Sequence, residues 1–169
     1  MRLMTVVWTA AATAATAVAG GVATDPDGAW YRLLRKPDWQ PPAIAFPVVW
    51  TALYADLAVS SAVALDSSDG EEAAVSTARQ QELTAYRSAL AANLVLNAAW
   101  SWLFWRARRP WVAAAECAVL TASSADLVRR TYKLNRGAGV ALAPYAAWCG
   151  FATALSTAVA RLNPGSAAD

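Results

Sequence analysis

The sequence contains no histidine among its 169 residues. That absence excludes haem held by a histidine, metal sites with histidine ligands and Ser-His catalytic triads, and no metal site is expected. Only two cysteines occur, Cys117 and Cys149. They form no CxxC pair and no disulfide framework, and both lie in apolar runs. The sequence therefore predicts two small, buried cysteine side chains.

Charge is also scarce. Charged residues make up 15% of the chain, against roughly 25% in soluble domains. The net charge of +2 gives no basis for binding nucleic acid. Hydrophobic residues reach 57%, mean hydropathy is +0.30, and the polar residues gather between long apolar runs. This pattern predicts an all-α, multi-pass integral membrane protein whose surface contacts lipid.

Five apolar segments are long enough to cross a bilayer, since a spanning helix needs about 20 mostly apolar residues. The third is the shortest, and the fourth is the weakest because it contains Glu116 and Asp126. We predict a five-helix transmembrane bundle, with a structured loop between the first two helices, as a single domain over residues 1–163. The predicted helices cover residues 3–24, 43–65, 84–105, 110–130 and 137–161.

Two stretches outside these helices have a different composition. Residues 66–82 form a polar, acidic linker, which we expect to be a surface loop with a helical extension into the third segment. Residues 164–169 form a tail, because Asn163 and Pro164 end the last helix.

The first segment has two interpretations. Arg2 followed by an alanine-rich run ending in "AVAGG" is typical of a secretory signal. The run continues past that small-residue site and includes Trp8, which is typical of a retained helix. Lysine and arginine are shared evenly between the two sides of a five-span arrangement, so the positive-inside rule does not orient the protein.

The third segment carries a polar and aromatic face. Asn93, Asn97, Trp100, Ser101 and Phe104 recur at the spacing of one helical face. Such a face is expected to point into the bundle rather than to lipid. It fits either hydrogen bonding between helices through the asparagines or the lining of a ligand cavity.

The fifth segment carries a second aromatic face. Trp148, Ala152 and Leu155 share a stripe, and the small Ala152 beside Trp148 leaves room for a flat ligand. The alternative is anchoring of Trp148 at the membrane interface, although that residue lies well inside its segment.

Three carboxylates fall within or near the predicted spans: Asp56, Glu116 and Asp126. Asp126 can pair with Arg129 or Arg130, whereas the other two have no evident partner. The sequence places no basic residue deep in a span, which argues against proton-coupled transport.

Three blocks of sequence resemble the TspO/MBR family of tryptophan-rich sensory proteins and translocator proteins, also called the peripheral benzodiazepine receptor family. The first block is Trp30–Tyr31 with "KPDWQPP" (Lys36 to Pro42) and "FPVVWTALY" (Phe46 to Tyr54). The second is "NLVLNAAWSWLFW" (Asn93 to Trp105). The third is "APYAAWCGFATALS" (Ala143 to Ser156), closed by "RLN".

The resemblance implies a membrane receptor, often a homodimer, whose first loop folds over a pocket between five helices. It implies a sensory or regulatory protein that binds a tetrapyrrole, either porphyrin or haem, with no obligatory cofactor. Two alternatives stay open: light- and oxygen-dependent porphyrin degradation, and transport of porphyrin or lipid-like solutes. We expect binding rather than enzymatic activity, since no acid–base pair is evident.

The family's pocket positions carry over, residue by residue, to twelve side chains. They are Trp30, Tyr31, Trp39, Pro42, Trp50, Asn97, Trp100, Ser101, Cys117, Trp148, Ala152 and Leu155. If the protein degrades porphyrin, the resemblance makes Trp30 and Trp148 the catalytic residues.

Two further expectations come from ligand chemistry. Arg32, Arg35 and Lys36 in the first loop could meet the carboxylates of a porphyrin. Without histidine, haem iron would lack its usual axial ligand, which favours the metal-free porphyrin or haem held by its ring. The C-terminal "LSTAVAR" lacks the tyrosine of the cholesterol motif, so cholesterol binding through it is not expected.

Overall fold

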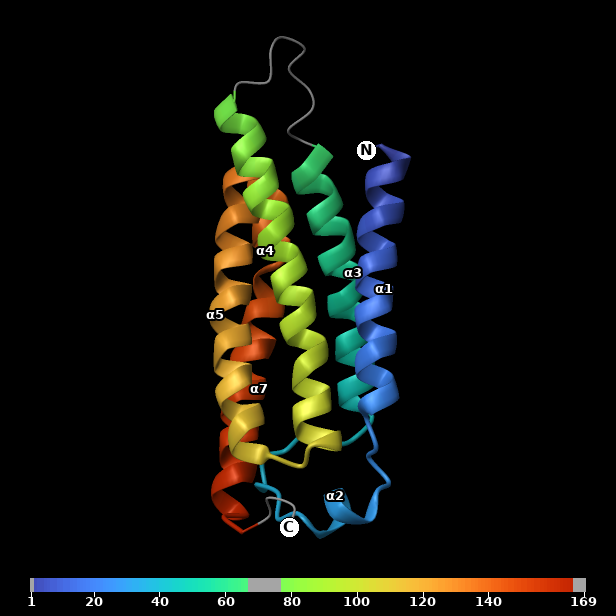
Figure 1. Ribbon diagram of the computed structural model, residues 1–169, viewed down its shortest axis with the longest axis vertical. Helices are drawn as coiled ribbons and strands as arrows, with labels where there is room; N and C mark the ends of the chain where they lie inside the picture. Colours follow the sequence, from blue (N-terminus) through green and yellow to red (C-terminus); the bar gives the residue numbers. More distant parts are fainter. Residues whose placement is uncertain (1, 67–76, 166–169) are drawn as a thin grey trace.

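The computed structural model describes residues 2–66 and 77–165, and every regular element in this part of the chain is a helix (Figure 1). The elements are α1 (Leu3–Ala23), α2 (Ala29–Leu33), α3 (Ala45–Asp66), α4 (Thr77–Ser101), η1 (Trp102–Arg106), α5 (Pro110–Leu134), α6 (Arg136–Ala141) and α7 (Ala143–Leu162). η1 continues α4 as a π-helix, and α6 leads into α7. Five long helices result, which confirms the predicted all-α class.

Four helical stretches are long and apolar enough to cross a membrane: α1, α3, α5 and residues 136–162. The protein is therefore a multi-pass membrane protein. The fifth long helix, α4, is not among these four, because its first turns are polar and its later turns carry Asn93 and Asn97. It nevertheless lies within the bundle, beside α1 and α5.

α4 begins at Thr77, before the predicted helix start at residue 84, which confirms the expected helical extension from the linker into the third segment. Alanine, arginine, glutamine and glutamate are good helix formers, so the polar stretch before residue 84 continues the helix. The first turns rise past the end of α3 (Figure 1). Residues 67–76 of the predicted linker and residues 166–169 of the predicted tail lie outside the described residues.

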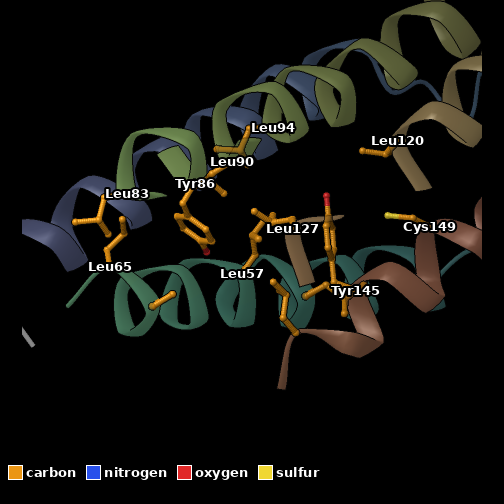
Figure 2. Close-up of a cluster of buried hydrophobic side chains, with 13 residues drawn as sticks. Leu57, Leu65, Leu83, Tyr86, Leu90, Leu94, Leu120, Leu127, Tyr145 and Cys149 are labelled. Carbon is orange, nitrogen blue, oxygen red and sulfur yellow. The ribbon is translucent and has the colours of Figure 1, made fainter. Parts of the chain in front are cut away.

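The bundle is held together differently in its two halves. Near α6 the interior is a cluster of buried hydrophobic side chains that includes Leu57, Leu90 and Leu127 (Figure 2). Tyr86 in this cluster donates a hydrogen bond to Ser61 Oγ at 3.1 Å. The other half, where α2 lies, has a smaller buried cluster of Leu34, Phe104, Ala113 and Val159, and the candidate site lies beside it.

Candidate functional site

All five long helices and the first loop enclose a cavity of about 810 Å³. Small-molecule sites usually range from about 300 to 1,000 Å³. α1 contributes mainly small residues, Ala17, Gly20 and Gly21, so the other helices supply most of the side-chain surface. Asp27 is the one charged residue among the described residues that line the cavity. The site therefore suits a large and mostly apolar ligand.

Four tryptophans line the cavity, and three of them come from three different long helices: Trp50 from α3, Trp100 from α4 and Trp148 from α7. Each is supported by a neighbouring ring. Trp50 stacks on Tyr54 with centroids 5.3 Å apart, and Trp100 stacks on Phe104 at 5.3 Å with an interplanar angle of 10°. Trp148 lies against Phe151 and Phe46, with centroids 5.1 and 6.2 Å away. Aromatic pairs of this kind fix ring orientation, so the walls are preformed.

The π-helical segment η1 widens the aromatic wall of α4. The amide of Ala107 donates to the carbonyl of Trp102 at 2.9 Å, which closes a wider turn than an α-helix has. Phe104 and Trp105 thereby line the cavity together with Trp100 and Ser101.

The same segment is fixed to the end of α1 on its outer side. Trp102 Nε1 donates to the carbonyl of Ala19 at 3.1 Å. Arg106 donates to the carbonyl of Val22 at 2.7 Å. These bonds hold the π-turn, and with it the aromatic rings inside, against a spanning helix.

A chain of hydrogen bonds closes the inner end of the cavity. Tyr54 Oη donates to Asn97 Oδ1 at 2.5 Å, and Asn97 Nδ2 donates to Tyr145 Oη at 3.1 Å. Tyr145 Oη in turn donates to Asn93 Oδ1 at 2.7 Å. The asparagine face thus joins α3, α4 and α7 by hydrogen bonds, and Asn97 also lines the cavity. The two interpretations of that face are compatible.

The first loop covers the open end of this half of the bundle. Trp30 packs edge-on against Phe104 with centroids 5.5 Å apart, and Tyr31 packs on Trp105 at 4.5 Å. Lys36 Nζ donates to the carbonyl of Tyr31 at 2.8 Å and lies 4.2 Å from the centre of its ring. The loop therefore has internal order and is anchored on the aromatic wall.

A two-way amide contact ties this loop to the end of α7. Asn163 Oδ1 accepts from the backbone N–H of Arg35 at 2.9 Å, and Asn163 Nδ2 donates to the carbonyl of Arg35 at 2.8 Å. The same Nδ2 donates to the carbonyl of Val159, which lines the cavity. Asn163 thus fastens the middle of the loop to a wall of the cavity.

Nine of the twelve predicted ligand-binding residues line the cavity. They are Tyr31, Trp50, Asn97, Trp100, Ser101, Cys117, Trp148, Ala152 and Leu155.

The other three predicted residues lie just outside the lining. Trp30 contacts the lining residue Phe104, and the half-exposed Trp39 contacts the lining residue Phe151 at 5.9 Å. Pro42 is exposed, and its carbonyl accepts from the amide of Ala45 at the start of α3.

The three loop cations predicted to meet carboxylates do not line the cavity either. Arg32 and Arg35 are exposed on the loop, and Lys36 is engaged with Tyr31. A ligand carboxylate would meet these cations at the rim rather than inside.

Several lining residues were not predicted. Tyr54 could have been found, because it lies one turn after Trp50 on the same helical face. Phe46 lies one turn before Trp50 and Phe151 one turn after Trp148, on the same helical faces, so both could have been found in the same way. Gly20 and Gly21 give no signal in the sequence, because their contribution is the absence of a side chain.

Two membrane-embedded carboxylates stay apart from the cavity. Asp56 Oδ1 accepts a hydrogen bond from Ser60, one turn further along α3, at 2.8 Å. Both carboxylate oxygens of Glu116 are buried and have no hydrogen-bond partner in the described part of the chain. Neither residue lines the site.

Comparison with known proteins gives a consistent result. A model of the TspO/MBR family matches residues 6–162. The tryptophan-rich sensory protein of Cereibacter sphaeroides is 34% identical over 145 residues, which cover 85% of this chain and 82% of the relative. The translocator protein of Sus scrofa is 33% identical over 138 residues, covering 80% and 76%. An uncharacterized membrane protein of Bacillus subtilis, YtaB, is 28% identical over 145 residues, covering 86% and 87%.

Proposed function

The chain belongs to the TspO/MBR family, and on that premise we propose that it binds a tetrapyrrole in the cavity between its helices, as a sensory or regulatory membrane protein. The observation that carries the proposal is the set of three tryptophans, Trp50, Trp100 and Trp148, which converge from three helices on one apolar volume. A porphyrin is a flat apolar ring, and indole faces stack on such rings.

The carboxylates of a porphyrin favour an orientation in which they point toward the loop end of the cavity. The two carboxylates are costly to bury without partners. The inner end of the cavity is closed by the hydrogen-bonded chain from Tyr54 to Asn93, whose members already bond one another. The carboxylates are therefore expected at the loop end, where Arg32 and Arg35 are exposed.

The loop residues outside the lining act through their neighbours in this proposal. Trp30 holds Phe104, and Trp39 holds Phe151, so each sets the position of a ring that would touch the ligand. Pro42 fixes the backbone where the loop enters α3.

A titration with protoporphyrin IX, read by tryptophan fluorescence, tests the proposal. Wild-type protein should show saturable quenching, and the variant with both Trp30→Ala and Trp148→Ala should bind at least roughly tenfold more weakly. Quenching that does not saturate, or that is the same in the variant, would exclude the cavity as the binding site.

A second candidate function, light- and oxygen-dependent degradation of the bound porphyrin, is favoured by one observation. The oxidisable side chains Trp148, Trp50 and Tyr54 line the same volume, whereas Asp27 is the one carboxylate among the described lining residues. Such a reaction would be photo-oxidative, with dioxygen as the oxidant. Illumination of the complex should give a new absorbing product that Trp148→Phe abolishes, and bleaching identical to that of free porphyrin would rule this candidate out.

A further inference from the structure

The outer face of α5 is apolar along most of its length and becomes basic and aromatic at its C-terminal end. Beyond Trp111 at its start, four exposed alanines recur every three or four residues, Ala115, Ala118, Ala122 and Ala125, with the exposed Val112 and Val119 beside them. Residues at this spacing form one strip along a helix. The strip is apolar, its alanine side chains are short, and it faces away from the bundle.

The same strip continues into a basic and aromatic cluster. Arg129, Tyr132 and Lys133 are exposed at positions that continue the spacing of the alanines, and Arg136 is exposed just past the end of the helix. The guanidinium of Arg136, just past the end of α5, lies 5.9 Å from the centre of the Tyr132 ring. The three cations and the phenol therefore gather in one place at the end of the apolar strip.

The length of the strip matches a bilayer. A helix rises about 1.5 Å per residue, so Trp111 and Tyr132 are roughly 30 Å apart along α5. The hydrocarbon core of a membrane is about 30 Å thick, and tryptophan and tyrosine prefer its two interfaces. The basic cluster then lies at the level of the lipid headgroups, and the alanines lie at the level of the acyl chains.

The charge of the cluster is only partly neutralised within the protein. Asp126 forms ion pairs with both Arg129 and Arg130, at 2.6 and 2.5 Å, as the sequence suggested for one of them. Within residues 2–66 and 77–165, no carboxylate pairs with Lys133 or Arg136. A headgroup phosphate would supply the missing negative charge and accept hydrogen bonds from both.

A simpler explanation covers part of this arrangement. Cations are favoured at the C-terminus of a helix because they face its negative end. That effect accounts for the sign of the charges but not for their position on the same strip as the exposed alanines, nor for the paired Tyr132.

We propose that an anionic phospholipid binds along the outer face of α5. Its phosphate contacts Lys133 and Arg136 beside Tyr132, and its acyl chains lie on the strip of alanines that ends at Trp111. This site is separate from the cavity, and it does not depend on tetrapyrrole binding.

Native mass spectrometry of the full chain in detergent tests this site, with phosphatidylglycerol and phosphatidylcholine of identical acyl chains as probes. Wild-type protein should retain phosphatidylglycerol in preference to phosphatidylcholine. Removing both Lys133 and Arg136 by alanine substitution should weaken phosphatidylglycerol binding roughly thirtyfold, because each cation near a headgroup contributes roughly fivefold to the affinity. The matched control removes two exposed arginines at the other end of the bundle, Arg109→Ala with Arg161→Ala, and should keep the wild-type preference.

Three results would overturn the proposal. One is a wild-type protein that does not distinguish the two lipids. Another is an equal loss in both double variants, which would mean a response to net charge alone. The last is full competition by glycerol phosphate without acyl chains, which would mean a soluble phosphate ligand instead of a lipid. Unchanged thermal unfolding of both variants shows that the effect is not a loss of fold.

Discussion

Trp39 and Trp148 both match pocket positions of the TspO/MBR family, but only one of them lines the cavity. Trp148 lines it, whereas Trp39 is 51% exposed and reaches it only through Phe151. The sequence shows both as members of the pocket, because a motif gives residue types and spacing but not which ring stands behind another.

Trp148→Ala should therefore weaken protoporphyrin IX binding more than Trp39→Ala. The first substitution removes a stacking surface, for a loss of roughly tenfold or more, and the second only loosens the support of Phe151, for a loss of a few-fold. Fluorescence titrations on the two single variants check this order. The reverse order would mean that the loop closes further over the ligand than its contact with Phe151 implies.

Tyr145 is fully buried, and its hydroxyl is the middle of the hydrogen-bonded chain that closes the cavity. Tyr145→Phe removes the partner of both Asn93 and Asn97, and leaves two buried amide groups short of a bond. The expected loss is about 1–2 kcal/mol of unfolding free energy. Thermal or denaturant unfolding in one detergent measures it. Tyr132→Phe, at an exposed tyrosine, is the control and should leave the unfolding free energy almost unchanged. If the two substitutions changed the unfolding free energy equally, the hydrogen bonds of Tyr145 would contribute no stability.

The position of α6 depends on one glycine, Gly139, which lies directly against α5. A Cβ atom on Gly139 would lie 2.4 Å from the Cα of Tyr132 in α5, closer than any real contact of this kind. α6 can therefore turn back along α5 only because residue 139 is glycine.

Gly139→Ala should destabilise the protein by roughly 1–3 kcal/mol, because α6 must move away from α5. Gly21→Ala is the matched control. A Cβ atom there meets nothing within 4 Å, and alanine is the better helix former, so stability should stay constant or rise. Thermal unfolding of the two variants measures both effects. A Gly139→Ala protein as stable as Gly21→Ala would show that α6 is not held as the structure has it.

The first loop covers the open end of the cavity, and Asn163 holds it. Asn163→Ala removes both bonds to the backbone of Arg35. We expect the association and dissociation rates of protoporphyrin IX to rise together, with a much smaller change in affinity, because a looser cover speeds passage in both directions. Stopped-flow fluorescence measures both rates.

Asn163→Asp provides a graded control for the loop, since it keeps an acceptor for the amide of Arg35 but loses the donor to its carbonyl. Its rates should lie between those of wild type and Asn163→Ala. A rise in the dissociation rate alone would instead mean that Asn163 stabilises the bound ligand and does not control its passage.

At the scale of the whole molecule, the helical class and the membrane location follow from hydrophobic periodicity, which depends only on which residues are apolar. The family follows from the spacing of residues such as Trp39, Trp50 and Trp148. Each of these is a local signal, so one sequence is enough to detect it.

Features that depend on contacts between distant segments could not be predicted in the same way. The π-turn at Trp102 is fixed by a bond to Ala19, and the loop is fastened by a bond from Asn163 to Arg35. The residues around Ala19 and Arg35 in the sequence do not indicate that either one is a hydrogen-bond partner. The cavity wall formed by Gly20 and Gly21 is likewise visible only when the helix opposite is in place.

The central claim is that the cavity between the helices holds a tetrapyrrole, and a structure determined with protoporphyrin IX in a lipid environment tests it most directly. Ordered density for the macrocycle is expected between Trp50, Trp100 and Trp148, with its carboxylates toward the loop that carries Arg32 and Arg35. Density for the porphyrin on the lipid-facing surface, with the cavity free of it at saturating concentration, would exclude the cavity as the tetrapyrrole site.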